Sequence, residues 1–238
     1  MTMLNYLPQC GSTNDEVVNF LRSGSAEIAG LCTFFQNNGR GQYGNRWEGA
    51  AGKNIALSLA VPASSVKLSD SLFNYYTALN IRRFTANLTR NEVKIKWPND
   101  LIIKHKKVCG ILIEKKKVNN RMYYIVGIGL NVLQEDFGDL PRAGSLLTQT
   151  GTHFNLTDVA ESMYTFLLGN FSETAGPEGI LQDYNSCLYK RNEVAVFRKD
   201  NISQNGMIST ADEDGNLWIE LEHGGLQKFY HKEIEMLY

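Results

Sequence analysis

The residues best suited to chemistry in this chain lie in one glycine-rich stretch, Gly39–Trp47, which reads GRGQYGNRW. Its three glycines within six positions allow backbone conformations that residues with a Cβ avoid, so the stretch can close around a ligand and offer N–H groups to it. Arg40 and Arg46 supply positive charge for a phosphate, and Trp47 supplies a flat surface for a ring. We interpret the stretch as a ligand-binding loop.

The glycine spacing also fits the G-x-G-x-x-G pattern of dinucleotide-binding folds and protein kinases, but a lone match is weak evidence. A dinucleotide fold would begin a helix here, whereas residues 45–54 are polar and contain further glycines, and no acidic residue stands near Val61. A kinase would need an H-R-D sequence downstream, which the chain lacks. A Walker A loop is excluded because Trp47 and Asn54 replace its glycine and its hydroxyl residue.

A second set of polar residues comprises Lys96, Lys107, Asn131 and the pair Asn99-Asp100. Cations around one carboxylate suit a magnesium nucleotide, because phosphoryl and nucleotidyl transfer depend on positioning and on charge neutralisation. Taken singly, each lysine or arginine is more often a solvated surface charge. The hypothesis of a nucleotide site therefore depends on the whole set together with the glycine-rich loop.

The sequence Ser12-Thr13-Asn14-Asp15-Glu16 places a hydroxyl three residues before an acid, which predicts a capping box at the start of a short amphipathic helix. This structural role alone explains the residue types. A hydroxyl pair at a helix start also lies among unpaired N–H groups, where a small polar group of a ligand can bind. Both interpretations remain open at this point.

Hydrophobic patterning predicts a mainly β scaffold with a few helices. One strand precedes the glycine-rich loop and another leaves it. Helices are expected from Ser69, over residues 157–168 and from Pro177, and Asn119-Asn120 is expected to form a hairpin turn. Strands are expected at residues 31–35, 54–61, 93–97, 101–103, 107–114 and 122–132, followed from residue 193 by short alternating strands typical of a small β-barrel.

Two glycines interrupt one of these strands, in the sequence Gly127-Ile128-Gly129-Leu130-Asn131. Glycine weakens a strand unless a ligand or another backbone approaches it closely. We therefore expect such an approach here, with the amide of Asn131 directed toward the ligand.

Composition limits the class of protein. The 43% hydrophobic content of 238 residues is enough for a sizeable core, and the net charge of -1 argues against a general nucleic-acid binder. Four distant cysteines without a C-x-x-C pair indicate neither a zinc site nor a redox dithiol, and fit reduced thiols in a cytosol. The N-terminus shows no apolar signal core, and we expect a cytoplasmic protein without membrane contact.

Four motifs, taken in order, resemble those of the biotin protein ligases: G-R-G-Q-Y-G-N-R-W (39–47), K-W-P-N-D (96–100), K-V-C-G-I-L-I-E (107–114) and G-I-G-L-N-V (127–132). The resemblance implies an α+β fold. A class II synthetase-like catalytic domain, residues 1–187, would hold a mixed, largely antiparallel sheet with helices packed on it. A small SH3-like β-barrel, residues 188–238, would follow.

The resemblance also implies an activity in two steps. The carboxylate of biotin attacks the α-phosphate of ATP, pyrophosphate leaves, and a lysine of a biotin carboxyl carrier domain then attacks biotinoyl-5′-AMP. ATP with Mg²⁺ and biotin would be the substrates, and the partner would be the carrier protein or domain of a biotin-dependent carboxylase. A homodimer is a further expectation from the family.

Residue roles follow from the same resemblance. Lys107 and Arg40 would be catalytic, with Lys107 reaching the carboxylate and then the acyl phosphate, and Asp100 is the candidate for a carboxylate linked to Mg²⁺. Biotin would contact Ser12, Thr13, Asn14, Gln36, Gly39, Arg40, Gly41, Gln42, Lys107 and Gly110, and ATP would contact Arg46, Trp47, Lys96, Asn99, Asp100 and Asn131.

The chain departs from the family pattern at two positions of the loop. Several relatives carry arginine where this chain has Gln42, and another basic residue where it has Asn45, so fewer charges would face the phosphates. We expect weaker retention of the adenylate, or a share of this role taken by Arg46. Because the ligase pattern begins at Ser12, we expect a short form without the N-terminal DNA-binding domain of the regulatory members.

Two rival functions remain. A lipoate-protein ligase has a related fold and similar adenylation chemistry, but the K-W-P-N-D motif and the run 107–114 favour biotin. A non-catalytic module that only binds biotin or nucleotide would be expected to lose Lys107 or Asp100, and both are present.

Overall fold

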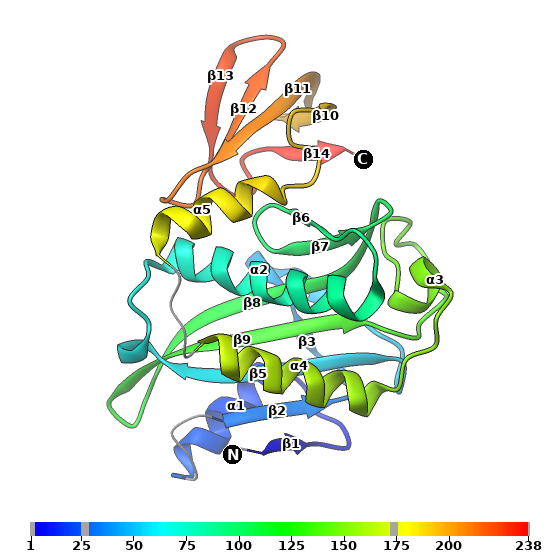
Figure 1. Cartoon of the computed structure of the whole chain (residues 1–238), viewed down its shortest axis with the longest axis vertical. Helices are drawn as coiled ribbons and strands as arrows, with labels where there is room; N and C mark the ends of the chain where they lie inside the picture. The colour runs from blue at the N-terminus through cyan, green and yellow to red at the C-terminus, as the bar shows by residue number, and fades with distance from the viewer. Residues whose placement is uncertain (1–2, 25–28, 172–175, 238) are drawn as a thin grey trace.

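A seven-stranded sheet organises most of the chain, as the computed structural model of residues 3–24, 29–171 and 176–237 shows (Figure 1). Among the described strands of this sheet, only the edge pair β1–β2 is parallel, and the other neighbours run antiparallel. The predicted mixed, largely antiparallel sheet is thereby confirmed. In sheet order the strands are β1 (Leu4–Tyr6), β2 (Ala29–Thr33), β5 (Asn54–Pro62), β9 (Arg121–Asn131), β8 (Lys106–Val118), β7 (Asp100–Ile103) and β6 (Lys94–Lys96).

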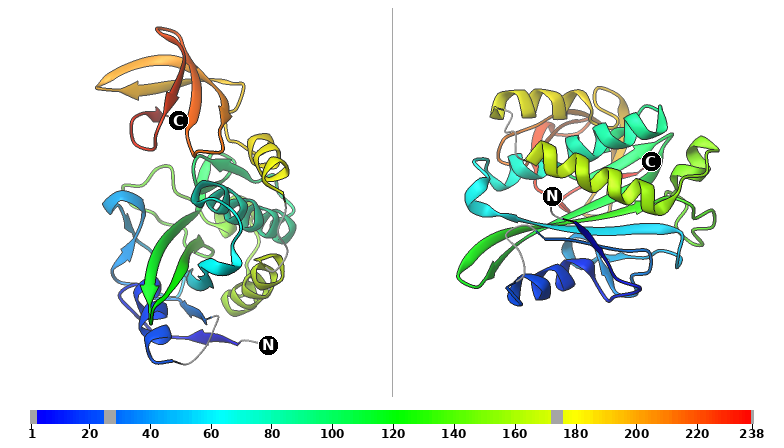
Figure 2. Two further views of the ribbon diagram at one scale, coloured as in Figure 1. Left: turned by 90° about the vertical axis from the view of Figure 1, so that its left-hand side faces the viewer. Right: turned by 60° about the horizontal axis from the view of Figure 1, so that its bottom comes forward.

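Helices cover the two faces of this sheet unequally (Figure 2). The helices α2 (Asp70–Thr89) and α4 (Leu156–Phe171) pack on one face, where they share the main hydrophobic core with α5 (Pro177–Ser186). The helix α1 (Thr13–Arg22) packs on the opposite face over a smaller apolar cluster. The opposite face is therefore left with room for a site beside α1.

The predicted helices form for the expected reasons. Ser69 caps α2 by accepting a hydrogen bond from Leu72 N at 3.3 Å, and proline stands in the first turn of α5. A short helix, α3 (Leu146–Thr150), begins with a capping box at Ser145. Burial of the apolar face holds these helices in place, and Leu79→Ala in α2 would cost about 2–5 kcal/mol, the usual range for a fully buried leucine.

Strand β9 shows how the sheet separates core from site. Tyr124, Val126, Ile128 and Leu130 point into the main core, and the residues between them face the side that carries α1. Side chains alternate across a strand, so the glycines at 127 and 129 leave that side hollow. Strand β9 follows β8 through Asn119 and Asn120, both at positive φ, as predicted for the hairpin turn.

The turn between β6 and β7 carries the K-W-P-N-D motif. Strand β6 ends at Lys96, the peptide bond between Trp97 and Pro98 is cis, and β7 begins at Asp100. The predicted end of the strand at proline is confirmed. Asp100 pairs with Gly110 of β8, which fixes the carboxylate at the edge of the hollowed face.

The C-terminal residues form a second sheet, five strands in the order β13-β12-β11-β10-β14. All its neighbouring pairs are antiparallel, and Phe197, Ile219 and Phe229 lie in its buried interior. The predicted β-rich module is present as an open sheet, since within the described residues β13 and β14 are its two edges. The strands are β10 (Val194–Lys199), β11 (Ile202–Ala211), β12 (Leu217–Leu221), β13 (Gly225–Phe229) and β14 (Glu235–Leu237).

The two sheets are joined through strand β6. Ile95 N donates to Cys187 O at 2.8 Å, and Tyr189 N donates to Ile95 O at 2.8 Å, so residues on both sides of the predicted domain boundary are fixed to the larger sheet. The boundary at residues 187 and 188 stays a prediction. No helix of the described residues is long and apolar enough to cross a membrane.

Candidate functional site

A pocket lies on the hollowed face of the large sheet, between the start of α1, the glycine-rich loop and the turn before β7. One residue of the C-terminal module, His231, also borders it. The lining residues are Ser12, Thr13, Asn14, Gln36, Arg40, Gly41, Gln42, Asn45, Arg46, Trp47, Ala56, Asn99, Asp100, Lys107, Gly110, Ile111, Leu112, Gly127, Ile128, Gly129 and His231. Most of the residues predicted from the motifs are thus brought together.

Small residues make the floor of the pocket. A Cβ at Gly127 would stand 2.3 Å from Asn14 Oδ1, and a Cβ at Gly129 would stand 2.2 Å from Trp47 Cε2. Neither position has space for a side chain. The sequence predicted a close approach of a ligand or a backbone at these glycines, and what approaches is a pair of side chains, Asn14 and Trp47.

One end of the pocket is a chain of uncharged hydrogen bonds. Gln36 Oε1 accepts from Thr13 N at 2.8 Å and lies 3.2 Å from Thr13 Oγ1. Behind them Ser58 Oγ lies 2.7 Å from Thr13 Oγ1 and 2.6 Å from Asn14 Oδ1, fully buried on β5. Buried polar groups are paired in this way because an unpaired one is costly, so these side chains have fixed orientations.

The predicted capping box at this helix is wrong. Ser12 is the N-cap of α1, but in the described residues its side chain makes no capping hydrogen bond. Gln36 supplies an acceptor to the N–H of Thr13 instead, and Asp15 of the predicted box is turned to Arg40. Contacts from distant segments have replaced the local ones, which favours the alternative interpretation of this sequence as part of a binding site.

The glycine-rich stretch folds into a small hairpin over the floor. Its strands are β3 (Gly39–Arg40) and β4 (Arg46–Trp47), joined by a 3₁₀ turn at Gln42–Gly44. Gly41 N donates to Asn45 O at 2.7 Å, which closes the turn. A Cβ at Gly39 would stand 2.4 Å from both Gln36 Nε2 and Trp47 O, so this glycine is needed for close packing.

Trp47 lies across the floor rather than at its margin. A Cβ built at Gly110 would meet Trp47 Cζ3 at 2.9 Å, so the indole covers strands β8 and β9 together. The ammonium of Lys107 lies 5.6 Å from the centre of the indole ring, within the range of a cation–π interaction. The indole therefore separates the uncharged end of the pocket from the charged end.

The charged end centres on Lys107 and Asp100. Lys107 Nζ lies 2.8 Å from Asp100 Oδ1, and both side chains are only partly exposed. The turn that carries Asp100 is held by buried contacts: Asn99 Nδ2 donates to Ile111 O, and Tyr184 of α5 donates through its hydroxyl to Pro98 O at 2.8 Å. This end offers a fixed cation and a fixed carboxylate close together.

Arg40 is bound by acidic residues at the mouth of the pocket. Its guanidinium donates to both carboxylate oxygens of Asp15, one of them at 2.8 Å, and to Glu114 Oε2 at 3.2 Å. The hydrogen bond from Arg40 holds the pKa of Asp15 below its usual range, against the effect of partial burial. Arg40 thereby ties β3 to α1 and to β8.

Three predicted site residues lie outside the pocket lining. Gly39 packs against Gln36 and Trp47 within the hairpin, and Lys96 lies in an adjoining cleft between the two sheets, which shares Asn45 and His231 with the pocket. Burial lowers the pKa of Lys96. The Nδ2 of Asn131 donates to Gly144 O at 3.0 Å and the residue is buried, so the contact of its amide with a ligand stays a prediction.

Three residues of the site were missed by the sequence reasoning. Ser58 and Glu114 contact the predicted residues directly, and Glu114 closes the quoted run 107–114, so a signal for it existed. His231 arrives from the C-terminal module, with its ring 5.4 Å from the ring of Trp97. Burial, followed by the positive charge of Lys96, lowers its pKa, which favours the neutral imidazole. Nothing near His231 in the sequence indicated this place.

Comparison with curated proteins finds relatives that share part of the chain. The bifunctional ligase/repressor BirA of Escherichia coli is 33% identical over 135 residues, which are 53% of this chain and 39% of that protein. The biotin–[acetyl-CoA-carboxylase] ligase of Mycobacterium tuberculosis is 33% identical over 150 residues, 60% of this chain and 54% of that protein. The matched region therefore spans about half the length of these relatives or less.

Solved structures share the fold over nearly the whole chain. The biotin protein ligase from Aquifex aeolicus in complex with biotin and ATP superposes with a TM-score of 0.81, covering 100% of this chain and 99% of that one at 20% identity. The biotin acetyl coenzyme A carboxylase synthetase from Helicobacter pylori gives 0.68, covering 96% and 100%, also at 20% identity. The α+β fold with its C-terminal module is confirmed by this similarity.

A protein-family comparison gives the remaining evidence. The model of the biotin/lipoate A/B protein ligase family matches residues 6–131, more than half of the 238 residues and the segment that holds nearly all of the pocket. On this match, and with the motifs gathered around one pocket, the chain belongs to the biotin/lipoate A/B protein ligase family.

Proposed function

We propose that this chain is an ATP-dependent biotin protein ligase, which activates biotin to biotinoyl-5′-AMP and transfers it to a lysine of a biotin carboxyl carrier domain. The observation that carries the proposal is the division of the pocket into an uncharged hydrogen-bonding end and a charged end, with small residues between them. Relatives that are named as biotin ligases add to it.

The uncharged end favours biotin over lipoate. A ureido ring carries N–H donors and a carbonyl acceptor, and the residues here offer both kinds of partner: Ser12, Thr13, Asn14 and Gln36. The dithiolane ring of lipoate has no such groups and would gain no hydrogen bond from these polar side chains. A site built to bind polar groups rejects an analogue that lacks them by a large factor.

The charged end suits the first chemical step. An oxygen of the biotin carboxylate attacks the α-phosphorus of ATP, the bond to the β-phosphate oxygen breaks, and pyrophosphate leaves. Lys107 stands where it can neutralise the carboxylate and the growing charge at phosphorus, held by Asp100 at 2.8 Å and by the indole of Trp47. Arg46 borders the same end and would meet the phosphates.

The second step transfers the acyl group. The amine of the acceptor lysine, after losing a proton, attacks the acyl carbon of biotinoyl-5′-AMP, and AMP leaves with the electrons of the broken anhydride bond. The same ammonium of Lys107 would stabilise the oxyanion at the acyl carbon. The hairpin at 39–47 would keep water from the anhydride until the acceptor arrives.

Mg²⁺ would enter with the nucleotide. Within the described residues no three acidic, histidine or cysteine side chains come together as a metal cage. One carboxylate, Asp100, lies at the charged end beside Asn99, and such a donor set fits a magnesium ion held mainly by phosphates and water. We therefore assign Asp100 as its protein contact, and Lys96 in the adjoining cleft as a contact of the nucleotide.

The proposal is tested by pyrophosphate exchange with biotin and with lipoate in parallel, followed by an avidin blot on a biotin carboxyl carrier domain. We expect exchange that depends on biotin and a biotinylated carrier. Exchange with lipoate alone would identify a lipoate ligase instead. Binding of biotin without any exchange would identify a module that only binds its ligand.

A further inference from the structure

We infer that Asp15 and Glu114 are positioning residues that hold Arg40, and with it the 39–47 hairpin, over the pocket. Arg40 donates to both carboxylate oxygens of Asp15 at the start of α1, and to Glu114 Oε2 of β8 at 3.2 Å. The hairpin is thereby fastened to two separate elements. The inference rests on the proposed function only for its effect on turnover.

Glu114 also contacts Asn14, which lines the pocket. Its Oε2 accepts from Asn14 Nδ2 at 2.8 Å, while Ser58 Oγ lies 2.6 Å from Asn14 Oδ1, so both ends of this amide are fixed. A single carboxylate therefore sets the orientation of a pocket amide and holds the arginine of the covering hairpin. This arrangement couples the uncharged end of the pocket to the position of the hairpin.

The charges of the cluster support this role. Lys116 Nζ lies 3.0 Å from Glu114 Oε1, so the cluster balances two acidic groups with two cations. Burial opposes ionisation of Glu114, but the hydrogen bond from Asn14 and the pair with Lys116 hold its pKa below the usual value. Both carboxylates therefore stay ionised near neutral pH and keep their hold on Arg40.

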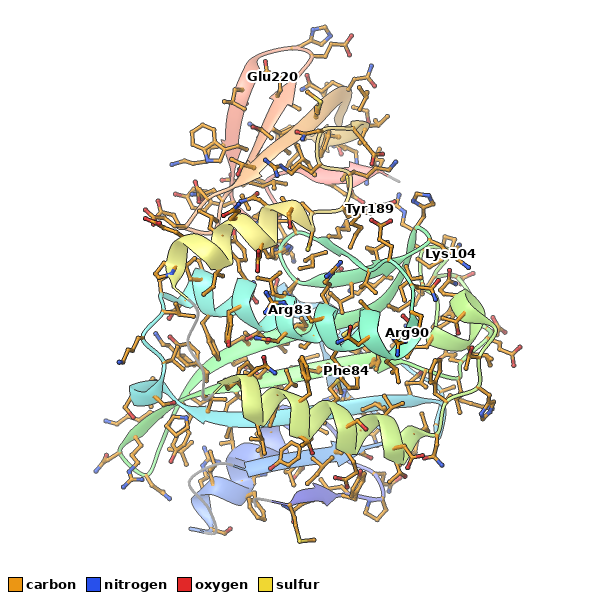
Figure 3. All side chains as sticks on the ribbon, in the orientation of Figure 1. Arg83, Phe84, Arg90, Lys104, Tyr189 and Glu220 are labelled. Atoms are coloured by element: carbon orange, nitrogen blue, oxygen red, sulfur yellow. The ribbon has the colours of Figure 1, made fainter. Side chains whose placement is uncertain are left out.

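Asp15 gives the cleaner test of the two. It does not line the pocket within the described residues, and 54% of its side chain is exposed, so its replacement leaves the lining unchanged. Asp15→Asn removes the charge and Asp15→Glu keeps it. A matched control is Asp183→Asn, because Asp183 of α5 pairs with Arg83 at 2.6 Å and has the same 54% exposure. Arg83, labelled in Figure 3, lies on α2, which packs on the sheet face opposite to α1.

The first measurement uses the full chain without added ligand. Hydrogen exchange of the amides at 39–47 should become about fivefold faster in Asp15→Asn, as expected for the loss of one partly screened ion pair. Asp183→Asn should leave these amides unchanged, and Asp15→Glu should restore most of the protection. Equal exchange in wild type and Asp15→Asn, or equal acceleration in Asp183→Asn, would overturn the inference.

The second measurement asks whether the held hairpin matters for turnover. Asp15→Asn should release its activated intermediate to water about fivefold faster while the KM for biotin stays within twofold, and Glu114→Gln should change both quantities because it also contacts Asn14. If the wild-type chain shows no biotin-dependent pyrophosphate exchange but the amide exchange responds to Asp15→Asn, the proposed function fails and the positioning role stands. If pyrophosphate exchange is normal but the amide exchange does not respond, the positioning role fails and the proposed function stands.

Discussion

Lys107→Ala is the substitution that most directly tests the charged end of the pocket. The ammonium of Lys107 stands 2.8 Å from Asp100 Oδ1 and 5.6 Å from the centre of the Trp47 ring. It is the only lysine in the pocket lining, taken over the described residues. Truncation removes the charge while the strand pairing of β8 remains, since that pairing depends on the backbone.

Two magnitudes separate a catalytic role from a structural one. About a third of the Lys107 side chain is exposed (34%), and an ion pair of this kind contributes at most about 1 kcal/mol to stability. An oriented donor that stabilises a transition state is worth about 2.7–4 kcal/mol, which is a factor of roughly 10²–10³ in rate. We therefore expect a small change in the free energy of unfolding and a large fall in the rate of adenylate formation.

The assay is the initial rate of biotin-dependent pyrophosphate exchange, with urea unfolding measured on the same samples. Lys115→Ala is the control, because Lys115 lies on the same strand but outside the pocket lining. Its Nζ pairs with Asp70 Oδ1 at 2.5 Å. Lys107→Arg keeps the charge and should retain more activity than Lys107→Ala. A rate for Lys107→Ala within threefold of wild type would refute the reasoning, as would an equal loss in Lys115→Ala.

Three further substitutions follow from the contacts of the site and of the C-terminal module. Gly129→Ala places a methyl group 2.2 Å from the indole of Trp47, so the indole must move. The rate of biotin-dependent pyrophosphate exchange should fall about tenfold, in line with the 1–3 kcal/mol cost of overpacking. Gln42→Arg adds a cation to the pocket lining and should lengthen the lifetime of the bound adenylate. Asp212→Asn should reduce the loss of stability in acid, because Asp212 accepts from Trp218 Nε1 at 2.8 Å.

The sign of the acid effect follows from the pKa of Asp212. Burial opposes ionisation, but hydrogen bonds from Asn216 and Trp218 hold the pKa below its usual value. A carboxylate with a lowered pKa contributes stability above its unfolded pKa of about 3.9, and this contribution is lost as the pH falls through the folded value. Urea unfolding at pH 7 and at pH 3 measures it, and an identical fall in both proteins would exclude the role.

Each of the other two substitutions has its own control. Gly179→Ala in α5 adds a methyl group with nothing within 4 Å, so the rate of pyrophosphate exchange should stay at the wild-type level. A similar fall in the rate of Gly179→Ala would remove the steric explanation for the effect of Gly129→Ala. Gln42→Glu has the opposite charge to Gln42→Arg. Equal adenylate lifetimes in these two variants would show that charge at this position does not govern retention.

Much of the site was predictable because its chemistry is concentrated in short motifs. In the K-W-P-N-D turn, proline ends strand β6 and so places Asp100 at the start of β7. Lys107 lies on β8, which pairs with β7, so the local sequence determines the positions of both Asp100 and Lys107. Strand β9 was predictable for a different reason. From Val126 to Leu130 apolar residues alternate with two glycines, so both glycines fall on the same face of the strand.

The error at the start of α1 occurred where distant partners replaced local ones. The capping box at Ser12 is a favourable local arrangement, but Gln36 lies close enough to take the N–H of Thr13, and Arg40 takes the acid. Asn131 was expected to face the ligand because it ends a glycine-containing strand. Its Nδ2 pairs with Gly144 O, in a segment beyond the strand that a single sequence cannot place in space, and its contact with a ligand stays a prediction.

Ser58 illustrates a signal that was present and went unused. Strand β5 is apolar on both sides of this serine, so the sequence already implied a buried hydroxyl, and a buried hydroxyl must have a partner. Because Ser58 lies two residues from Ala56 on the same face, alternation alone puts it under the pocket. His231 has no equivalent signal in the sequence. Its position depends on how the C-terminal module packs on β6, and this packing joins segments that lie far apart in the sequence. Residues fixed by alternation can be read from a strand, whereas residues fixed by packing between modules require the structure.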